Sequence, residues 1–303
     1  MNETFPNKNA TIIEDLEQGS IEWLKTRQQH ITATDVAAIL GKSPWNTPLT
    51  LYTAKKQENP TPASSPWMKA GHMYEDALLN HAAEHFGMTD LVHGRVLEDG
   101  WKLASLDGDA LLNGERVIVE AKTSTNPSHW FAKDGSEIVP EYYRLQVQYQ
   151  MLVSGVGTTI FTVGNLDGKT FGDYGEWFSR TVHADLELQA YIENECEKFF
   201  NLLQSNTPPS PQLSPYDEWV GKAETEILKD KVGTEDTEAE LSPTAVTQYQ
   251  FLKQQEKILK AQIQGQYNYL LEQMGTAKYG TIEGHRVAEW VNNFGRQYLK
   301  VKK

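Results

Sequence analysis

The Asn113-Gly114 step is the sequence feature that most constrains the fold. A type I′ turn needs positive φ at both central residues, and Asn-Gly tolerates this best. If these two residues form the turn of a hairpin, the flanking strands pair so that Asp107 lies opposite Glu120. Opposed side chains on one face of a sheet have Cβ atoms about 4.5–5.5 Å apart, and like charges there are destabilising. The sequence therefore predicts that a cation lies between these two carboxylates.

Lys122 lies two residues beyond Glu120 and hence on the same face of the strand. Two carboxylates and a lysine favour a site for a hard divalent cation, with the ammonium beside a water molecule or a phosphate group. The alternative is a solvated hairpin whose acids face water. Ile118 argues against that alternative, because a wet face seldom carries a large aliphatic residue. Asp109, opposite Ile118, is expected to be solvated.

Length and cysteine content limit the class of protein. The 303 residues suffice for one large core with an appendage or for two domains. The single cysteine, Cys196, excludes a disulfide framework, and without a CxxC pair a thiolate metal site is not expected. The sequence shows neither a signal-peptide pattern nor an apolar run long enough to span a bilayer. We therefore expect a cytoplasmic protein with no membrane partner.

The charge is strongly negative and unevenly distributed. A formal net charge of −13 argues against a protein that coats nucleic acid, because such proteins attract phosphate through a net positive potential. A local basic channel remains compatible with this charge. The last 18 residues form the basic end, with five basic residues against one acid.

A candidate anion site precedes the hairpin. The pattern predicts a helix over residues 21–29 that ends near Arg27. A second helix is expected from Thr32 or Thr34 to Gly41, so that its free N–H groups lie close to that arginine. A helix N-terminus, a guanidinium and a hydroxyl together can bind an anion. An ordinary helix cap beside a surface arginine is the alternative.

Two further helices contribute polar residues. Residues Trp67–Phe86 have the pattern of one long helix, in which Gly71 and Glu75 share a face. Glu75 is the natural third acid beside Asp107 and Glu120. The alternative is a solvated glutamate. Residues 141–155 predict an amphipathic helix with Tyr143, Gln146 and Gln150 on one stripe. Its glutamines suit hydrogen bonds to a lysine, a water or a nucleotide.

The remaining pattern divides the chain into three parts. Residues 88–102 are expected to form one strand that leads into the hairpin. The Pro-rich stretch near residue 207 marks a boundary. We predict a domain over 1–206, a linker over 207–241, and an extension over 242–303 with one helix and a small basic β unit.

Five short motifs occur in one order along the chain. They are RxxxITAT (Arg27 to Thr34), GxxxE (Gly71 to Glu75), SLDG (Ser105 to Gly108), VEAK (Val119 to Lys122) and YRLQVQY (Tyr143 to Tyr149). Over residues 18–205 this order resembles the lambda-exonuclease-type (YqaJ-like) viral recombination nucleases, a branch of the PD-(D/E)xK superfamily. Each motif alone is weak, but five in the right order are strong. The usual proline before the motif aspartate is Leu106 here, a mild departure because that position supplies no metal ligand.

The resemblance implies a fold and an activity. The fold is α/β (α+β), with a restriction-endonuclease-like core whose mixed central sheet is flanked by helices. The activity is a Mg²⁺-dependent 5′→3′ double-strand DNA exonuclease that leaves 3′ single strands for recombination by annealing. Two Mg²⁺ per active site are expected, with Mn²⁺ as a substitute.

The resemblance also implies roles for individual residues. The metal ligands would be Asp107, Glu120, the Ala121 carbonyl and Glu75. Lys122 would orient or help to deprotonate the attacking water, and Gln146 would help to hold this group. The 5′-phosphate and DNA contacts would be Arg27, Thr34, Ser105 and Tyr143.

The implied partners are double-stranded DNA ends, a single-strand annealing protein and further copies of the chain, which in this family form trimers. The alternatives are a related PD-(D/E)xK endonuclease or RecB-type nuclease, and a DNA-end-binding protein without turnover. A binding module gains nothing from paired acids that face phosphate, which argues against the last. A glycosidase also uses paired carboxylates, but it leaves Lys122 and the anion site without a role.

Overall fold

The structure of the chain is a computed structural model that describes residues 5–14, 16, 18–58, 60, 66–165, 177–213, 218–230, 232–233, 238–293 and 295–301. The chain forms two compact units, residues 1–232 and 233–303. Two of the basic residues at the C-terminal end, Lys302 and Lys303, lie outside the described residues. No helix in the described part of the chain combines the length and apolarity needed to cross a membrane.

A five-stranded mixed sheet is the centre of the first unit. Its strands, in spatial order, are β3 (Thr89–His93), β6 (Gly108–Leu112), β7 (Glu115–Ser124), β8 (Thr158–Asn165) and β9 (Trp177–His183). β7 and β8 are parallel, whereas the other neighbouring pairs are antiparallel. The predicted mixed sheet is confirmed.

The β6–β7 hairpin turns at Asn113 and Gly114, whose φ angles are +53° and +84°. Its ladder runs from Leu112 opposite Glu115 to Gly108 opposite Val119, which is the predicted register. The register matters because a slip of one residue would move every side chain to the other face. Asp107 immediately precedes this ladder.

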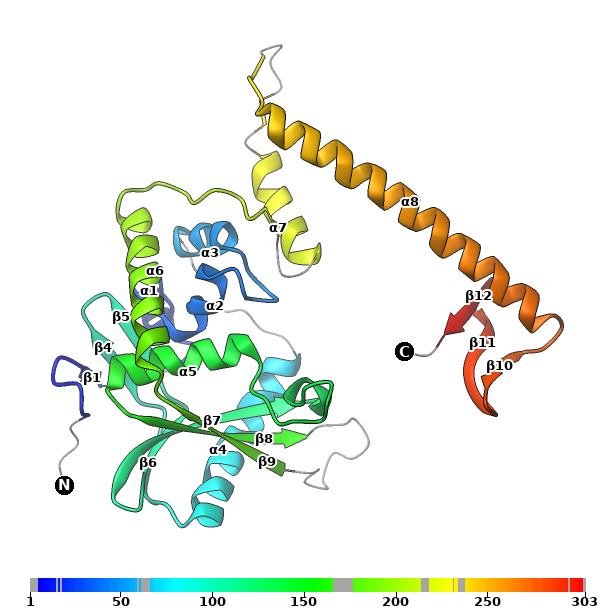
Figure 1. The fold of residues 1–303 in the computed structure, drawn as a ribbon. Helices are drawn as coiled ribbons and strands as arrows, with labels where there is room; N and C mark the ends of the chain where they lie inside the picture. Colours follow the sequence, from blue (N-terminus) through cyan, green and yellow to red (C-terminus); the bar gives the residue numbers. More distant parts are fainter. Residues whose placement is uncertain are drawn as a thin grey trace. The chain divides into compact units, whose positions relative to one another are not determined.

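Helix α4 (Pro66–Phe86) covers one face of the sheet and α5 (Glu141–Ser154) covers the other (Figure 1). The α4 side is a small apolar cluster that includes Leu78, Leu79, Ala82, Val117, Val119, Ala121 and Ile160. A Cβ atom at Gly108 would lie 3.2 Å from the Leu79 side chain. Glycine therefore lets α4 pack closely beside the strand that Asp107 precedes.

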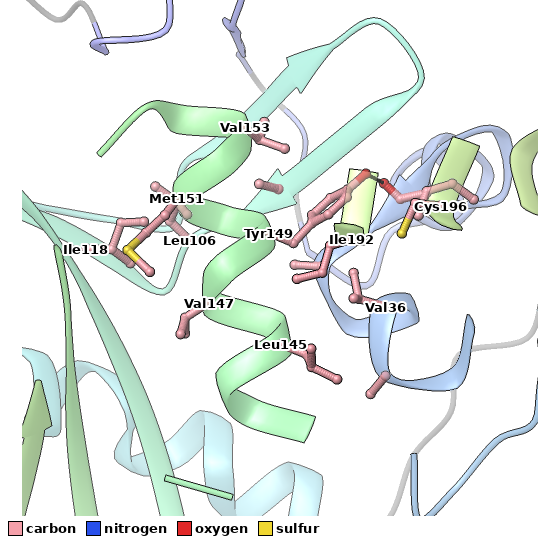
Figure 2. Packing of buried hydrophobic residues seen from close by; sticks show 14 of the residues in the cluster. Val36, Leu106, Ile118, Leu145, Val147, Tyr149, Met151, Val153, Ile192 and Cys196 are labelled. Atoms are coloured by element: carbon pink, nitrogen blue, oxygen red, sulfur yellow. Dashed lines mark hydrogen bonds between the residues drawn. The ribbon is translucent and has the colours of Figure 1, made fainter. Parts of the chain in front are cut away.

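Helix α5 lies in the main core. Figure 2 shows Leu145, Val147, Tyr149, Met151 and Val153 of α5 among side chains from several elements, including Leu106 and Ile118. The Tyr149 hydroxyl donates a hydrogen bond to the Ile31 carbonyl at 2.9 Å. The hairpin face that carries Ile118 and Glu120 is therefore buried under α5, and the solvated-hairpin alternative is wrong.

The prediction that Asp109 is solvated is also wrong. Its side chain is fully buried and lies between two arginines, Arg95 at 3.5 Å and Arg116 in closer contact. Both guanidiniums also lie over the Phe5 ring. Arg116 is on the partner strand of the same hairpin, so the predicted register already offered this partner. Arg95 lies outside the hairpin and did not follow from that register.

A four-stranded sheet stands beside the central one. Its order is β1 (Thr11–Ile13), β4 (Val96–Asp99), β5 (Lys102–Ser105) and β2 (Ile31–Thr32). The single strand expected over residues 88–102 is thus wrong, since β3 and β4 belong to different sheets. Turn-forming glycines at 94 and 100 interrupt the run.

The other helices of the first unit are α1 (Ile21–Gln29), α2 (Val36–Ile39), α3 (Pro48–Lys55), α6 (Leu186–Gln204) and α7 (Glu218–Lys229), with 3₁₀ turns η1 (Ala33–Asp35) and η2 (Pro127–Trp130). The helix expected to end at Gly41 is instead a 3₁₀ turn followed by one short α-helix. Helix α7 lies within the predicted linker, and its Val220 is fully buried. The first compact unit continues to Val232, past the boundary predicted at residue 207.

The second unit consists of helix α8 (Pro243–Met274) and the antiparallel strands β10 (Tyr279–Ile282), β11 (His285–Asn293) and β12 (Arg296–Val301). Ala288 and Leu299 are buried in it. The Leu299 N–H donates to the Tyr267 hydroxyl of α8 at 3.1 Å. The predicted C-terminal helix and small β unit are confirmed.

Candidate active site

Three oxygen groups converge on the Lys122 ammonium. Lys122 Nζ contacts Glu120 Oε1, donates to the Ala121 carbonyl at 3.2 Å, and lies 3.9 Å from Asp107 Oδ2. The oxygens belong to three residues predicted as metal ligands. The hairpin therefore brings Asp107, Glu120 and Lys122 together, as predicted from its register. The Ala121 carbonyl, which the family resemblance implied as a ligand, lies beside them.

Glu120 is held by two glutamines of α5. Gln146 Nε2 donates to Glu120 Oε1 at 2.5 Å, and Gln150 Nε2 donates to Oε2 at 2.9 Å. Glu120 is fully buried, so these donors replace the water that its carboxylate has lost. Gln150 lay on the predicted stripe but was not among the predicted site residues. Its spacing of four from Gln146 was the signal.

The surroundings of Asp107 disfavour the charged form of its carboxyl group. Its Oδ2 accepts a hydrogen bond from the Ala121 N–H at 3.0 Å, and a quarter of its side chain is exposed. Burial raises the pKa of Asp107 well above its ordinary value, and the neighbouring Glu120 raises it further. Lys122 and the Ala121 N–H lower it only in part.

Glu75 joins this cluster from α4. The helix runs beside β7, and Gly71, one turn earlier, faces Thr123 of that strand. Burial raises the pKa of Glu75; His72, 3.5 Å away, lowers it, and Glu120 raises it. Glu75 is therefore close enough to Glu120 and Lys122 for their charges to influence its pKa.

The surroundings of Lys122 favour its charged form. Burial alone would lower the pKa of Lys122, but the carboxylates of Glu120 and Asp107 outweigh burial and raise it above the ordinary value. Its Nζ also lies 5.3 Å from the centre of the Tyr143 ring, a cation–π contact. Tyr143 in turn stacks on the buried Trp130. The structure thus places Tyr143 against Lys122, and its DNA contact stays a prediction.

Arg27 and Thr34 form the core of the candidate anion site. Arg27 Nη2 donates to Thr34 Oγ1 at 2.8 Å, and the guanidinium lies 4.4 Å from the Trp23 ring centre. Thr34 is exposed, and its hydroxyl is 3.2 Å from that of Thr32. The predicted pair is therefore in contact, with Thr34 exposed and Arg27 half-buried.

Ser105 lies between the two sites along the chain. β2 and β5 are parallel, so the residues that end or follow them, Ser105 and Thr34, lie at the same end of the strand pair. In the described part of the chain, the buried Ser105 Oγ has no hydrogen-bond partner. The Ser105 carbonyl accepts from Gln150 Nε2 at 3.0 Å, and the same amide group bonds Glu120.

The donor chemistry of the cluster fits a hard divalent cation, which prefers carboxylate and carbonyl oxygens. Among the residues that the structure describes, no group of three or more His, Cys, Asp or Glu side chains is arranged to hold a metal ion. The Lys122 ammonium lies among the oxygens instead. The ligand set therefore stays a prediction that is supported by donor type and by the net negative charge.

Comparison with known proteins places this geometry in context. Residues 22–157 match the YqaJ-like viral recombinase domain family. A search of curated proteins found no match. The fold is similar to that of an alkaline exonuclease from Laribacter hongkongensis, with 19% identity over 69% of this chain and 100% of that chain and a TM-score of 0.50.

A second structure of the Laribacter enzyme, in complex with dAMP, has a TM-score of 0.48 at 19% identity, covering 69% of this chain and 100% of that chain. A phage-related exonuclease from Haemophilus somnus 129PT has 14% identity over 58% of this chain and 96% of that chain, with a TM-score of 0.41. The first Laribacter structure confirms the predicted α/β fold, with a mixed central sheet flanked by helices.

Proposed function

We propose that the chain, whose residues 22–157 match the YqaJ-like viral recombinase domain family, is a Mg²⁺-dependent 5′→3′ exonuclease of double-stranded DNA. Its product would carry 3′ single-stranded overhangs for homologous recombination by strand annealing. Double-stranded DNA ends are the proposed substrate. An annealing protein and a homotrimer are proposed from the family resemblance alone.

The convergence of Asp107, Glu120 and the Ala121 carbonyl on one ammonium is the observation that supports this proposal best. A set of oxygens with a net negative charge in a largely buried site is unfavourable unless a cation shares it. Lys122 supplies one positive charge beside the two carboxylates of Asp107 and Glu120. A divalent cation would complete the neutralisation.

The proposed roles follow from the contacts. Asp107, Glu120 and the Ala121 carbonyl would hold Mg²⁺, with Glu75 assisting at a second ion. The metal would supply Lewis-acid activation of a water molecule and stabilisation of the charge that develops on the phosphate. Gln146 and Gln150 would keep Glu120 in place. Because the neighbouring carboxylates favour the charged form of Lys122, we propose that it orients the water or the phosphate as a cation. Tyr143 gives it a second contact.

Recognition of the 5′ end is proposed for Arg27, Thr34 and Ser105. The guanidinium and hydroxyls suit a phosphate group. Ser105 is two residues from Asp107, which limits their separation along the backbone to about 7 Å. A terminal phosphate bound at Ser105 would therefore leave the neighbouring phosphodiester bond close to Asp107.

Digestion of linear duplexes with and without a 5′-phosphate tests the proposal. We expect mononucleotides in Mg²⁺, none in EDTA, faster digestion of phosphorylated ends, and slow or no cutting of closed circles. Cutting of closed circles would indicate an endonuclease. DNA binding without any metal-dependent cleavage would contradict the proposed activity.

A further inference from the structure

The parts of the proposed anion site come from different elements, and no single element fixes them together. Arg27 is in the last turns of α1, whereas Thr34 belongs to the η1 turn. Their 2.8 Å hydrogen bond joins the two side chains but does not place their backbones. Something else must hold the end of α1 against the η1 turn.

Lys55, in the last turn of α3, lies at this junction. Its Nζ donates to the Arg27 carbonyl at 2.8 Å and to the His30 carbonyl at 2.8 Å, and lies 2.7 Å from Asp35 Oδ2. An ammonium group has three donors, and these three acceptors use all of them. Only 6% of the Lys55 side chain is exposed, so no exchange with bulk water loosens the arrangement.

Asp35 extends the link to the η1 turn. The same Oδ2 accepts a hydrogen bond from the Thr32 N–H at 2.7 Å, which caps the turn that carries Thr34. One carboxylate oxygen thus receives both the Lys55 ammonium and the backbone of the turn. Gln28, next to Arg27, adds a second link to α3 by donating to the carbonyls of Ala54 (3.3 Å) and Gln57 (2.8 Å).

Stability alone is a weak reason for this arrangement. Replacing a buried ion pair by apolar residues of similar volume is often neutral or stabilising, because two charges lose their water on burial. A buried pair does, however, fix geometry. Helix α3 provides a firm base for it, since its own start is capped by Thr47 and its Leu49, Leu51 and Tyr52 are buried.

We infer that the buried Lys55–Asp35 pair is a positioning device for recognition of a terminal phosphate: it sets the backbones that carry Arg27 and Thr34 at the spacing an end phosphate requires. The inference rests on the proposed function and deepens it. Lys55 does not touch the phosphate in this scheme. It acts through Arg27 and the η1 turn, and is a positioning residue.

The test compares blunt duplexes that differ only in a 5′-phosphate or 5′-hydroxyl, with the full chain. Dissociation constants are measured in EDTA, where no cleavage occurs, and their ratio is the phosphate preference. We expect Lys55→Met to reduce this preference by about tenfold or more, since a displacement of about 1 Å can have effects of that size. Binding of the hydroxyl duplex should not change, which a general loss of structure would not permit.

Two further variants distinguish an effect of Lys55 on backbone position from an effect of its charge and from a loss of folding. Lys55→Met/Asp35→Asn removes both charges; we expect the preference to stay lost, and its recovery would overturn the inference in favour of simple electrostatics. Lys102→Met is the matched control, because Lys102 is also largely buried and contacts Asp99 at 3.0 Å and Glu193 at 2.5 Å instead. It should keep the wild-type preference.

If Lys55→Met does not fold, Asp35→Asn provides the measurement. Asparagine can still cap the Thr32 N–H but loses the ion pair, so we expect a smaller loss of preference. An unchanged preference in whichever variant is folded would overturn the inference. A wild-type chain that degrades DNA without any phosphate preference would also overturn the inference, but it would leave the proposed nuclease activity intact. A wild-type chain that binds phosphorylated ends selectively and cleaves nothing would contradict the proposed function alone.

Discussion

Glu120 is the residue on which the proposed active site depends. It is fully buried, and its two oxygens accept hydrogen bonds from Lys122, Gln146 and Gln150. A buried carboxylate without such donors would be protonated or destabilising. These donors therefore replace the water that the Glu120 carboxylate has lost on burial under α5.

Lys122→Ala tests the role of the lysine. We expect turnover to fall by about 10²-fold or more, the usual range for a group that assists proton transfer or orientation at the reacting centre. Mg²⁺ and DNA binding should persist because the oxygens remain. Single-turnover digestion and calorimetric metal titration measure the two effects. The control is Lys198→Ala, because the Lys198 side chain of α6 is exposed. Wild-type turnover in Lys122→Ala would remove the lysine from the mechanism.

Asp107→Asn should stabilise the metal-free protein while abolishing activity. Because the pKa of Asp107 is raised in the folded state, the folded protein still holds a proton at pH values where the unfolded chain has released it. The free energy of unfolding therefore falls as the pH rises from the ordinary carboxyl range to the pKa of Asp107 in the folded state. At pH 8 the variant escapes this loss, and its melting temperature in EDTA should exceed that of the wild type by about 2–4 °C per kcal/mol gained.

The same comparison repeated at low pH is the internal control for Asp107. At a pH below the ordinary carboxyl range, residue 107 is uncharged both in the wild type and in Asp107→Asn. The difference in melting temperature between the two proteins should therefore vanish. Mg²⁺ should stabilise the wild type at pH 8 but not the variant. A variant that melts below the wild type at pH 8 in EDTA would show that the charge at Asp107 is already well compensated.

At the scale of elements, the β6–β7 hairpin sets the geometry of the site. Gly114 has φ +84°, a conformation that disfavours any residue with a side chain. We expect Gly114→Ala to lower the free energy of unfolding by about 1–2 kcal/mol, measured by urea denaturation. Gly157→Ala is the control, because a Cβ there meets open space and its φ is not in the left-handed region. Equal effects of the two substitutions would argue against a strained turn.

The hairpin was predictable because its determinants are local. The Asn-Gly turn fixes the register, and the register fixes which side chains face each other. Most helices were likewise marked by caps and periodicity, as Ser20 and α1 show. The order of five motifs indicated the fold and the site residues together.

The missed features depend on contacts between distant segments. Asp109 contacts Arg95, which lies outside the hairpin, and the separation of β3 from β4 requires a second sheet that includes β1 and β2. The link of Lys55 to Arg27 and Asp35 spans 28 and 20 positions in the chain. No periodicity over a short window reports such pairings.

At the scale of the whole molecule, the division into two units predicts that the first can act alone. A chain ending at Val232 should fold and digest linear duplexes, because its core and all predicted site residues lie within it. A chain ending at residue 206 should be less stable, since it lacks α7, whose buried Val220 and Glu224 belong to the first unit. Thermal denaturation and digestion assays on the two truncated chains test both expectations. Equal stability of the two truncated chains would place the domain boundary at residue 207.

The proposed mechanism depends on where the divalent cation binds. A crystal of the protein grown with Mn²⁺ and measured at the manganese absorption edge would locate it. We expect an anomalous peak bounded by Asp107, Glu120 and the Ala121 carbonyl, with Lys122 moved off Glu120. An anomalous peak elsewhere, or Lys122 still bonded to Glu120 at saturating Mn²⁺, would contradict the proposed metal site.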